Sequence, residues 1–305
     1  MLQKRPVIFI ILLLILTTAS LAHSAGSPGP YLYEDTKRLV SLVESAAGAI
    51  ESKGQQAFRE FGTKGSKWLN DTHYLFVYDL DGTCVFHPIT PQLIGKNLID
   101  LKDMDGKPVI RMITDIGRKP GKNASGWLFY LWEEQTQFTP LWKSSYIRKA
   151  VAPDGKAYVV GCGVYIIKME KAFIKERVDL ASELLKTRGK DFAFAQLRDP
   201  STPFHFLETY IFVMDDRGQS VVDPAFPGMH RDLTGFRDAL GRPVVKEMLQ
   251  KLTKSDEAWI QYMWPKPGGT LPSRKVAYVR KVKVGTEVFV VGADFFLASP
   301  IWMRK

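Results

Sequence analysis

Residues 74–88 read YLFVYDLDGTCVFHP, and residues 210–224 read YIFVMDDRGQSVVDP, an offset of 136 positions. Seven of these fifteen positions are identical, whereas two unrelated stretches of this length share about one. Shorter matches follow in the same order and at nearly the same offset, among them Gly106-Lys-Pro108 with Gly241-Arg-Pro243 and Tyr146-Ile-Arg148 with Tyr278-Val-Arg280. The chain therefore contains two tandem copies of one unit.

Each copy has the pattern of a long helix followed by strands. Apolar residues from Leu39 to Ile50 recur at three- and four-residue steps, which predicts an amphipathic helix, and residues 173–185 repeat this pattern. Asp81-Gly82 predicts a hairpin turn between strands at 74–79 and 83–87, because glycine accepts a positive φ. A short helix at 108–116 follows, then strands at 126–133, 145–152 and 157–165. This order predicts an α+β fold, with an antiparallel sheet and a long N-terminal helix in each copy.

The first 25 residues are typical of a secretory signal peptide. Lys4 and Arg5 precede an apolar stretch of ten, Val7–Leu16, and small residues follow, with cleavage expected after Ala22 or Ser24. A spanning helix needs about 20 apolar residues, so an uncleaved anchor is the alternative. We expect a periplasmic or secreted protein with a first copy at 26–166, a second copy at 167–305 and no output domain of its own.

Composition and charge exclude several classes of function. The net charge of +10 is spread as single lysines and arginines without a nucleic-acid motif, so we expect no nucleic-acid partner. Five scattered histidines provide no metal site, and we expect no cofactor. The two cysteines, Cys84 and Cys162, lie in apolar strand-like runs and are interpreted as free buried thiols, with a disulfide as the alternative.

The motifs of the first copy resemble those of bacterial Cache domains, closest to the single-Cache type of chemoreceptors, sensor kinases and stand-alone periplasmic proteins. They include Asp81-Gly82, His87-Pro88, Ile94-Gly95-Lys96-Asn97-Leu98, Gly126-Trp127, Lys143-Ser-Ser-Tyr146 and Gly163-Val-Tyr165. The resemblance implies two tandem PAS-like domains, each with a long helix packed along the sheet. It also implies a pocket between the sheet and its covering loops, often occupied by a small carboxylate or amino acid.

Five residues of the first copy are candidates for contact with such a ligand. Tyr130 and Trp132 share one strand face and carry polar tips on broad rings, although core packing explains them equally. Lys143 can hold a carboxylate and Tyr146 can donate to it. Their spacing of three puts them on opposite faces of a regular strand, so a shared ligand requires a bulge or a lysine in the preceding loop. His87 is a ligand contact or a turn residue.

The second copy repeats most of these candidates, namely Tyr262, Trp264, Lys275 and Tyr278. Arg274 competes with Lys275. Asp294 stands where the first copy has a glycine, and a carboxylate inside an apolar strand is costly unless it is paired. It is expected to bind a ligand amine or to form an internal salt bridge with an arginine.

These features predict an extracytoplasmic sensor, not an enzyme, that binds a small carboxylate or amino-acid-like ligand. We expect it to pass its signal, as in chemotaxis, to a separate membrane receptor, sensor kinase or transporter. The alternative is an interaction module whose pockets are filled by side chains. A remoter alternative is a phosphatase of the haloacid-dehalogenase type using Asp79 and Asp81, but that chemistry needs a parallel strand, and the second copy loses the second aspartate.

Overall fold

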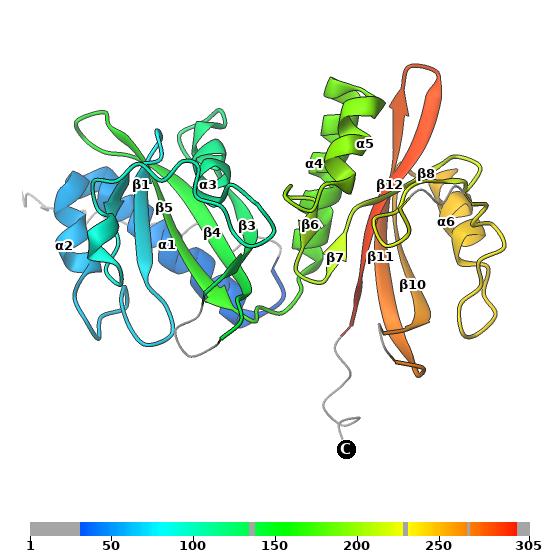
Figure 1. The fold of residues 1–305 in the computed structure, drawn as a ribbon, viewed down its shortest axis with the longest axis horizontal. Coiled ribbons are helices and arrows are strands. Elements are labelled where there is room, and N and C mark those ends of the chain that lie inside the picture. Colours follow the sequence, from blue (N-terminus) through cyan, green and yellow to red (C-terminus); the bar gives the residue numbers. More distant parts are fainter. Residues whose placement is uncertain (1–30, 134–137, 228–230, 267–268, 298–305) are drawn as a thin grey trace, which may run out of the picture.

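The computed structural model describes residues 31–133, 138–227, 231–266 and 269–297. The predicted signal peptide lies outside the described residues. Two five-stranded antiparallel sheets are present, one in each copy, and Figure 1 shows them side by side. The α+β prediction is confirmed.

The first copy opens with helix α1 (Glu34–Lys53), followed by a short 3-10 turn, η1 (Gly54–Gln56), and helix α2 (Ala57–Phe61). Its sheet has the strand order β2-β1-β5-β4-β3. The strands are β1 (Leu75–Asp79), β2 (Cys84–Phe86), β3 (Ser125–Trp132), β4 (Leu141–Val151) and β5 (Ala157–Tyr165). The 3-10 turn η2 (Pro91–Leu93) and helix α3 (Val109–Arg118) lie between β2 and β3. All the elements predicted for this copy are present.

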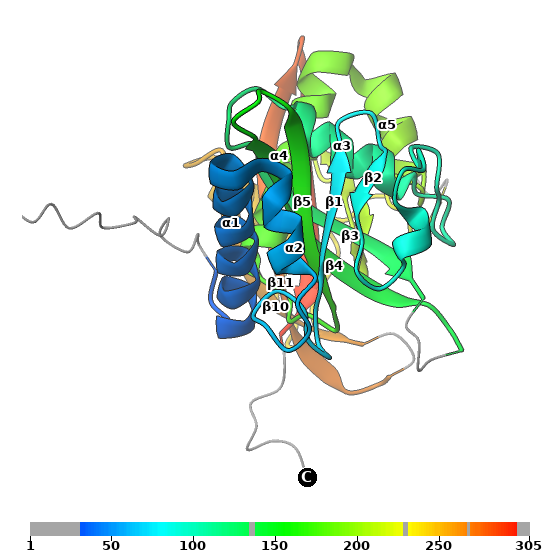
Figure 2. The same cartoon turned by 90° about the vertical axis from the view of Figure 1, so that its left-hand side faces the viewer.

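Helices cover both faces of the first sheet. The fully buried residues Val43, Ala46 and Ile50 line one side of α1, which packs on β4 and β5. Helix α3 places Ile110 and Ile113 in a separate apolar cluster on the other face. Figure 2 shows α1 and α3 on opposite sides of the strands. The cavity described below lies on the α3 side.

The second copy repeats this plan with a longer entry. Helices α4 (Lys171–Arg188) and α5 (Lys190–Arg198) precede a two-stranded ribbon of β6 (His205–Phe206) and β7 (Thr209–Tyr210). The sheet order is β10-β11-β12-β8-β9, the order of the first sheet read from its other end. Its elements are β8 (Phe212–Asp215), β9 (Ser220–Val222), α6 (Val244–Leu252), β10 (Glu257–Pro265), β11 (Pro272–Val284) and β12 (Glu287–Phe296). Helix α5 and the ribbon have no counterpart among the predicted elements.

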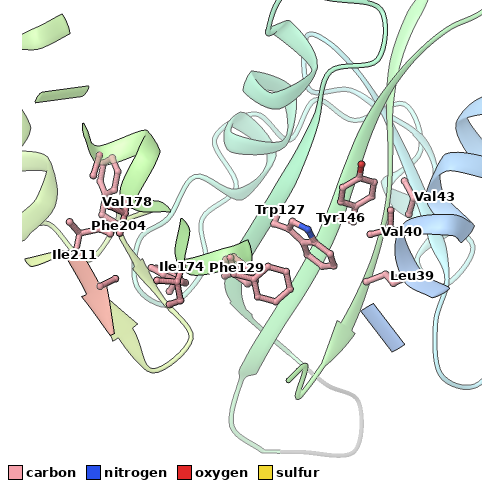
Figure 3. Packing of buried hydrophobic residues seen from close by; sticks show 14 of the residues in the cluster. Leu39, Val40, Val43, Trp127, Phe129, Tyr146, Ile174, Val178, Phe204 and Ile211 are labelled. Atoms are coloured by element: carbon pink, nitrogen blue, oxygen red, sulfur yellow. The ribbon is translucent and has the colours of Figure 1, made fainter. Parts of the chain in front are cut away.

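One apolar core joins the two copies. Phe173 of α4 packs its ring against Trp127 and Phe129 of β3, at centroid distances of 4.7 and 5.1 Å. Figure 3 shows the cluster running from α1 across β3 to α4 and the second copy. We propose the boundary between residues 166 and 167, because β5 ends at Tyr165 and α4 begins at Lys171. Within the described residues, no helix is long and apolar enough to span a bilayer.

Candidate functional site

A cavity lies between the first sheet and α3. Its volume is about 20 Å³, room for about one water molecule. The lining is mostly aromatic and aliphatic, with a lysine and a histidine as its ionisable nitrogen groups: Tyr74, Phe76, Tyr78, His87, Val109, Ile110, Ile113, Tyr130, Trp132 and Lys143. An apolar wall with few polar groups is the usual composition of a small-molecule site.

Lys143 brings a buried cation to this cavity. Its side chain is 2% exposed, and its Nζ donates a hydrogen bond of 2.7 Å to the Tyr74 hydroxyl. The same Nζ lies 4.4 Å from the centre of the Tyr74 ring, within the range of a cation–π contact. Burial lowers the pKa of Lys143 from 10.5 to about 8. Among the carboxylates that the structure describes, none forms an ion pair with this lysine, so its charge lacks a protein counterion there.

His87 follows β2 and is held in a defined tautomer. Its Nδ1 accepts a hydrogen bond of 3.0 Å from the Thr90 backbone N–H, so its ring proton lies on Nε2. Burial, and then the charge of Lys143, lowers the pKa of His87 to about 4. The ring is therefore neutral at pH 7. In this environment His87 is both a turn residue and part of the cavity wall, and Nε2–H is its available donor.

Tyr130 and Trp132 also line the cavity. The Tyr130 hydroxyl lies 3.0 Å from Ser145 Oγ, and its ring meets the Trp132 ring edge-on at 5.5 Å. Burial raises the pKa of Tyr130 well above its usual value. Its hydroxyl stays protonated, as a donor or acceptor beside the lysine.

Tyr146 does not reach this cavity, which corrects the prediction that it shares a ligand with Lys143. Strand β4 is regular across both residues and begins at Leu141, four positions earlier than predicted, so a spacing of three places them on opposite faces. The Tyr146 hydroxyl donates to Glu44 of α1 at 2.9 Å, and its ring packs on Trp127. Tyr146 thus links the sheet to α1.

In the second copy, Lys275, Tyr262 and Asp294 form one internal cluster. Lys275 Nζ lies 2.8 Å from Asp294 Oδ1, and the Tyr262 hydroxyl donates to Asp294 Oδ2 at 2.6 Å. The expected internal salt bridge is present, but its cation is this lysine and not an arginine. Arg274 is exposed near the start of β11, and the Trp264 ring packs on the Phe236 ring at a centroid distance of 4.6 Å.

Tyr278 lies on the opposite face of its strand, as Tyr146 does. Its hydroxyl donates to Glu257 at 2.5 Å and accepts from Lys175 of α4 at 2.6 Å. The prediction that Tyr278 joins Lys275 at one ligand is wrong for the same reason of strand parity.

Asp79 and Asp81 lie at the hairpin turn between β1 and β2. Asp79 Oδ1 accepts the backbone N–H groups of Asp81 and Thr83 at 3.1 and 2.8 Å, and Asp215 does the same in the second copy. Strand β1 is antiparallel to both of its neighbours, whereas the phosphatase motif needs a parallel strand. Asp79 therefore stabilises the hairpin turn that contains Asp81.

The two cysteines are free and buried. Burial raises the pKa of Cys84 to about 11 and that of Cys162 to about 12, so both stay protonated as inert thiols. In the part of the chain that the structure describes, no group of three His, Cys, Asp or Glu side chains is arranged to hold a metal ion.

The cavity contains residues that the sequence reasoning missed. Tyr74, Phe76 and Tyr78 reach it from β1 and the residue before it, and Ile110 and Ile113 reach it from α3. Alternation along residues 74–78 would have placed the three aromatic rings on one face. The contact between Tyr74 and Lys143 joins positions 69 apart in sequence, and no local pattern indicates it.

Comparison with known proteins identifies the family. A sequence model of the Cache domain matches residues 63–293. The chain belongs to the Cache family. The match crosses both copies, and it confirms the resemblance seen in the motifs. Cache domains are extracytoplasmic ligand-binding modules of signalling proteins, of the kind found in chemoreceptors and sensor kinases.

Curated relatives of this chain include a chemotaxis protein and a sensor kinase. The chain is 31% identical over 96 residues to the methyl-accepting chemotaxis protein McpP of Pseudomonas putida, covering 29% of this chain and 18% of that protein. It is 34% identical over 93 residues to the sensor histidine kinase MctS of Rhizobium johnstonii, covering 30% and 19%. The matched stretch therefore spans about a fifth of each relative.

A solved structure described as "Structural basis for carboxylic acid recognition by a Cache chemosensory domain" also matches part of this chain. The match has 24% identity and a TM-score of 0.36, and covers 44% of this chain and 94% of that one.

Proposed function

We propose that the first copy binds a small carboxylate in the cavity beside Lys143. The observation that carries this proposal is a buried cation with no carboxylate partner among the described residues. Burying an unpaired charge is costly, and the depressed pKa of Lys143 expresses that cost. A ligand that supplies a negative charge offsets the cost of burying the Lys143 ammonium group. We therefore expect the ion pair with Lys143 to contribute most of the binding energy of a carboxylate.

The neighbouring groups fit the two oxygens of a carboxylate. The Tyr74 hydroxyl accepts from Lys143, so its own proton is available to a ligand oxygen. The Nε2–H of His87 is a second neutral donor on the same wall. Phe76, Ile110 and Ile113 supply apolar surface for a short carbon chain.

We infer that the protein acts outside the cytoplasm and reports ligand binding to a membrane partner. The predicted signal peptide and the Cache family support the location. A separate receptor, sensor kinase or transporter is the expected partner, because the relatives that this chain resembles are a chemotaxis protein and a sensor histidine kinase. The signal concerned is ligand occupancy, as in chemotaxis.

Calorimetric titration of the purified protein with two- to four-carbon monocarboxylates tests the proposal. We expect one site per chain, with no heat from the matching neutral amides. Lys143→Ala is expected to abolish binding, whereas Lys149→Ala, at a half-buried position near the other end of the same strand, is expected to leave it unchanged. Equal affinity for carboxylate and amide, or unchanged binding by Lys143→Ala, contradicts the proposal.

A further inference from the structure

The two copies carry a lysine at the same place in the sheet, Lys143 and Lys275, but differ at the cross-strand pair next to it. In the first copy, Ser145 of β4 pairs with Gly163 of β5. In the second copy, Ala277 of β11 pairs with Asp294 of β12. The lysine of each copy lies two residues earlier along its strand and therefore projects from the same face. The aspartate thus replaces a glycine next to an equivalent ammonium group.

In the first copy this position has no room for a side chain. A Cβ atom at Gly163 would lie 2.3 Å from Ser145 Oγ and 2.8 Å from Lys143 Cε. The lysine stem packs directly over the glycine, and its ammonium group faces the cavity. Position 163 therefore cannot supply a carboxylate in this copy, whereas the cavity leads to the ammonium group.

In the second copy the chain itself supplies the carboxylate. Asp294 directs one oxygen to Lys275 and the other to the Tyr262 hydroxyl, at 2.8 and 2.6 Å. Tyr262 is the repeat of Tyr130, whose hydroxyl in the first copy bonds to a serine instead. Both oxygens of Asp294 are therefore engaged by the same residue types that face the cavity of the first copy.

We propose that Asp294 is a built-in ligand, a covalently attached carboxylate that occupies the second Cache site. The second copy then does not bind a free carboxylate, and ligand sensing is confined to the first copy. Removal of this side chain converts the second copy into a carboxylate site. The claim about the first copy rests on the proposed function. The claim about the second copy does not, because the experiment below tests it in a chain whose first site is disabled.

The test is chemical rescue in a chain whose first site is silenced by Lys143→Met. The side chain of aspartate beyond Cα is CH2COO⁻, so acetate is the matching probe. We expect acetate to leave the melting temperature of K143M unchanged. The double variant K143M/D294G should melt lower, and acetate should raise its melting temperature by about 2 °C or more. Acetamide and chloride at equal concentration should not.

Adding Lys275→Met to the double variant gives the matched control, which should lose the response to acetate. If the glycine variant does not fold without acetate, its yield on refolding in acetate against acetamide gives the same readout, and Asp294→Ala is the milder replacement. A rise in the melting temperature of K143M itself with acetate overturns the inference, as does an equal response of the double and triple variants. If the wild-type protein does not bind carboxylates at Lys143, the proposed function is contradicted. The comparison of the double and triple variants still decides whether Asp294 occupies the second site.

Discussion

Replacement of Lys143 with methionine is expected to stabilise the protein while abolishing carboxylate binding. The pKa of this lysine falls from 10.5 to about 8 in the fold, so carrying the charge at neutral pH costs about 3 kcal/mol. Methionine has a similar length and no charge. Loss of the hydrogen bond to Tyr74 costs about 1 kcal/mol. The variant should therefore be more stable than the wild type by about 2 kcal/mol at pH 7.

The pH dependence of this gain follows from the depressed pKa. Between pH 8 and 10.5, the lysine holds its proton in the unfolded chain but releases it in the folded chain. The stability of the wild type therefore rises with pH across this window, whereas K143M lacks this increase. Urea unfolding of both proteins at pH 7 and pH 10 measures the difference. We expect the advantage of the variant to vanish near pH 10.

Lys275→Met is the matched control, and it is expected to change the stability of the protein in the opposite direction. Lys275 and Asp294 are 17% and 20% exposed and form an ion pair. Removing the lysine leaves the carboxylate half-buried without its cation, which should destabilise the protein by about 1 kcal/mol. If K143M is destabilised as much as K275M, the charge of Lys143 is already satisfied by the protein, and the reasoning for a ligand site fails.

Three further predictions concern the same site. Carboxylate affinity should be constant from pH 6 to about 7.5 and fall about tenfold per pH unit above pH 8, because only protonated Lys143 forms the ion pair; constant calorimetric affinity up to pH 10 contradicts this. Gly163→Ala should lower both the carboxylate affinity and the melting temperature, since its Cβ would lie 2.8 Å from Lys143 Cε. The control Gly48→Ala on α1 has no atom within 4 Å of its new Cβ and should stabilise the fold by about 0.5–1 kcal/mol. Tyr74→Phe should weaken carboxylate binding about tenfold, and Tyr146→Phe should leave it unchanged. If calorimetry shows a greater loss of affinity for Tyr146→Phe than for Tyr74→Phe, Tyr146 contacts the ligand and this account of the site is wrong.

The fold was predictable because the repeat and the hairpin signal are local and occur twice. The Asp81-Gly82 turn, the amphipathic helix and the position of each strand along the chain depend on local patterns of residues. The start of β4 was missed because Trp142, Lys143 and Ser144 mix apolar and polar types and give no clear alternation. The lysine lies inside this strand, beneath α3, and only the packed fold explains its burial.

The candidate site was predictable only in part. Four of the predicted residues line the cavity, namely His87, Tyr130, Trp132 and Lys143. All of them except His87 recur in the second copy. Tyr146 recurs as well, but its recurrence reflects contact with the long helix of each copy, and strand parity was the better guide. The lysine partner of Asp294 follows from register, a relation between strands that one sequence does not reveal.

A crystal structure of the protein grown in saturating acetate or propionate tests the central claim most directly. The account predicts one carboxylate in the first copy, with an oxygen about 3 Å from Lys143 Nζ, and Asp294 still paired with Lys275 in the second copy. A ligand bound elsewhere, with the Lys143 cavity holding only water at full saturation, would contradict it.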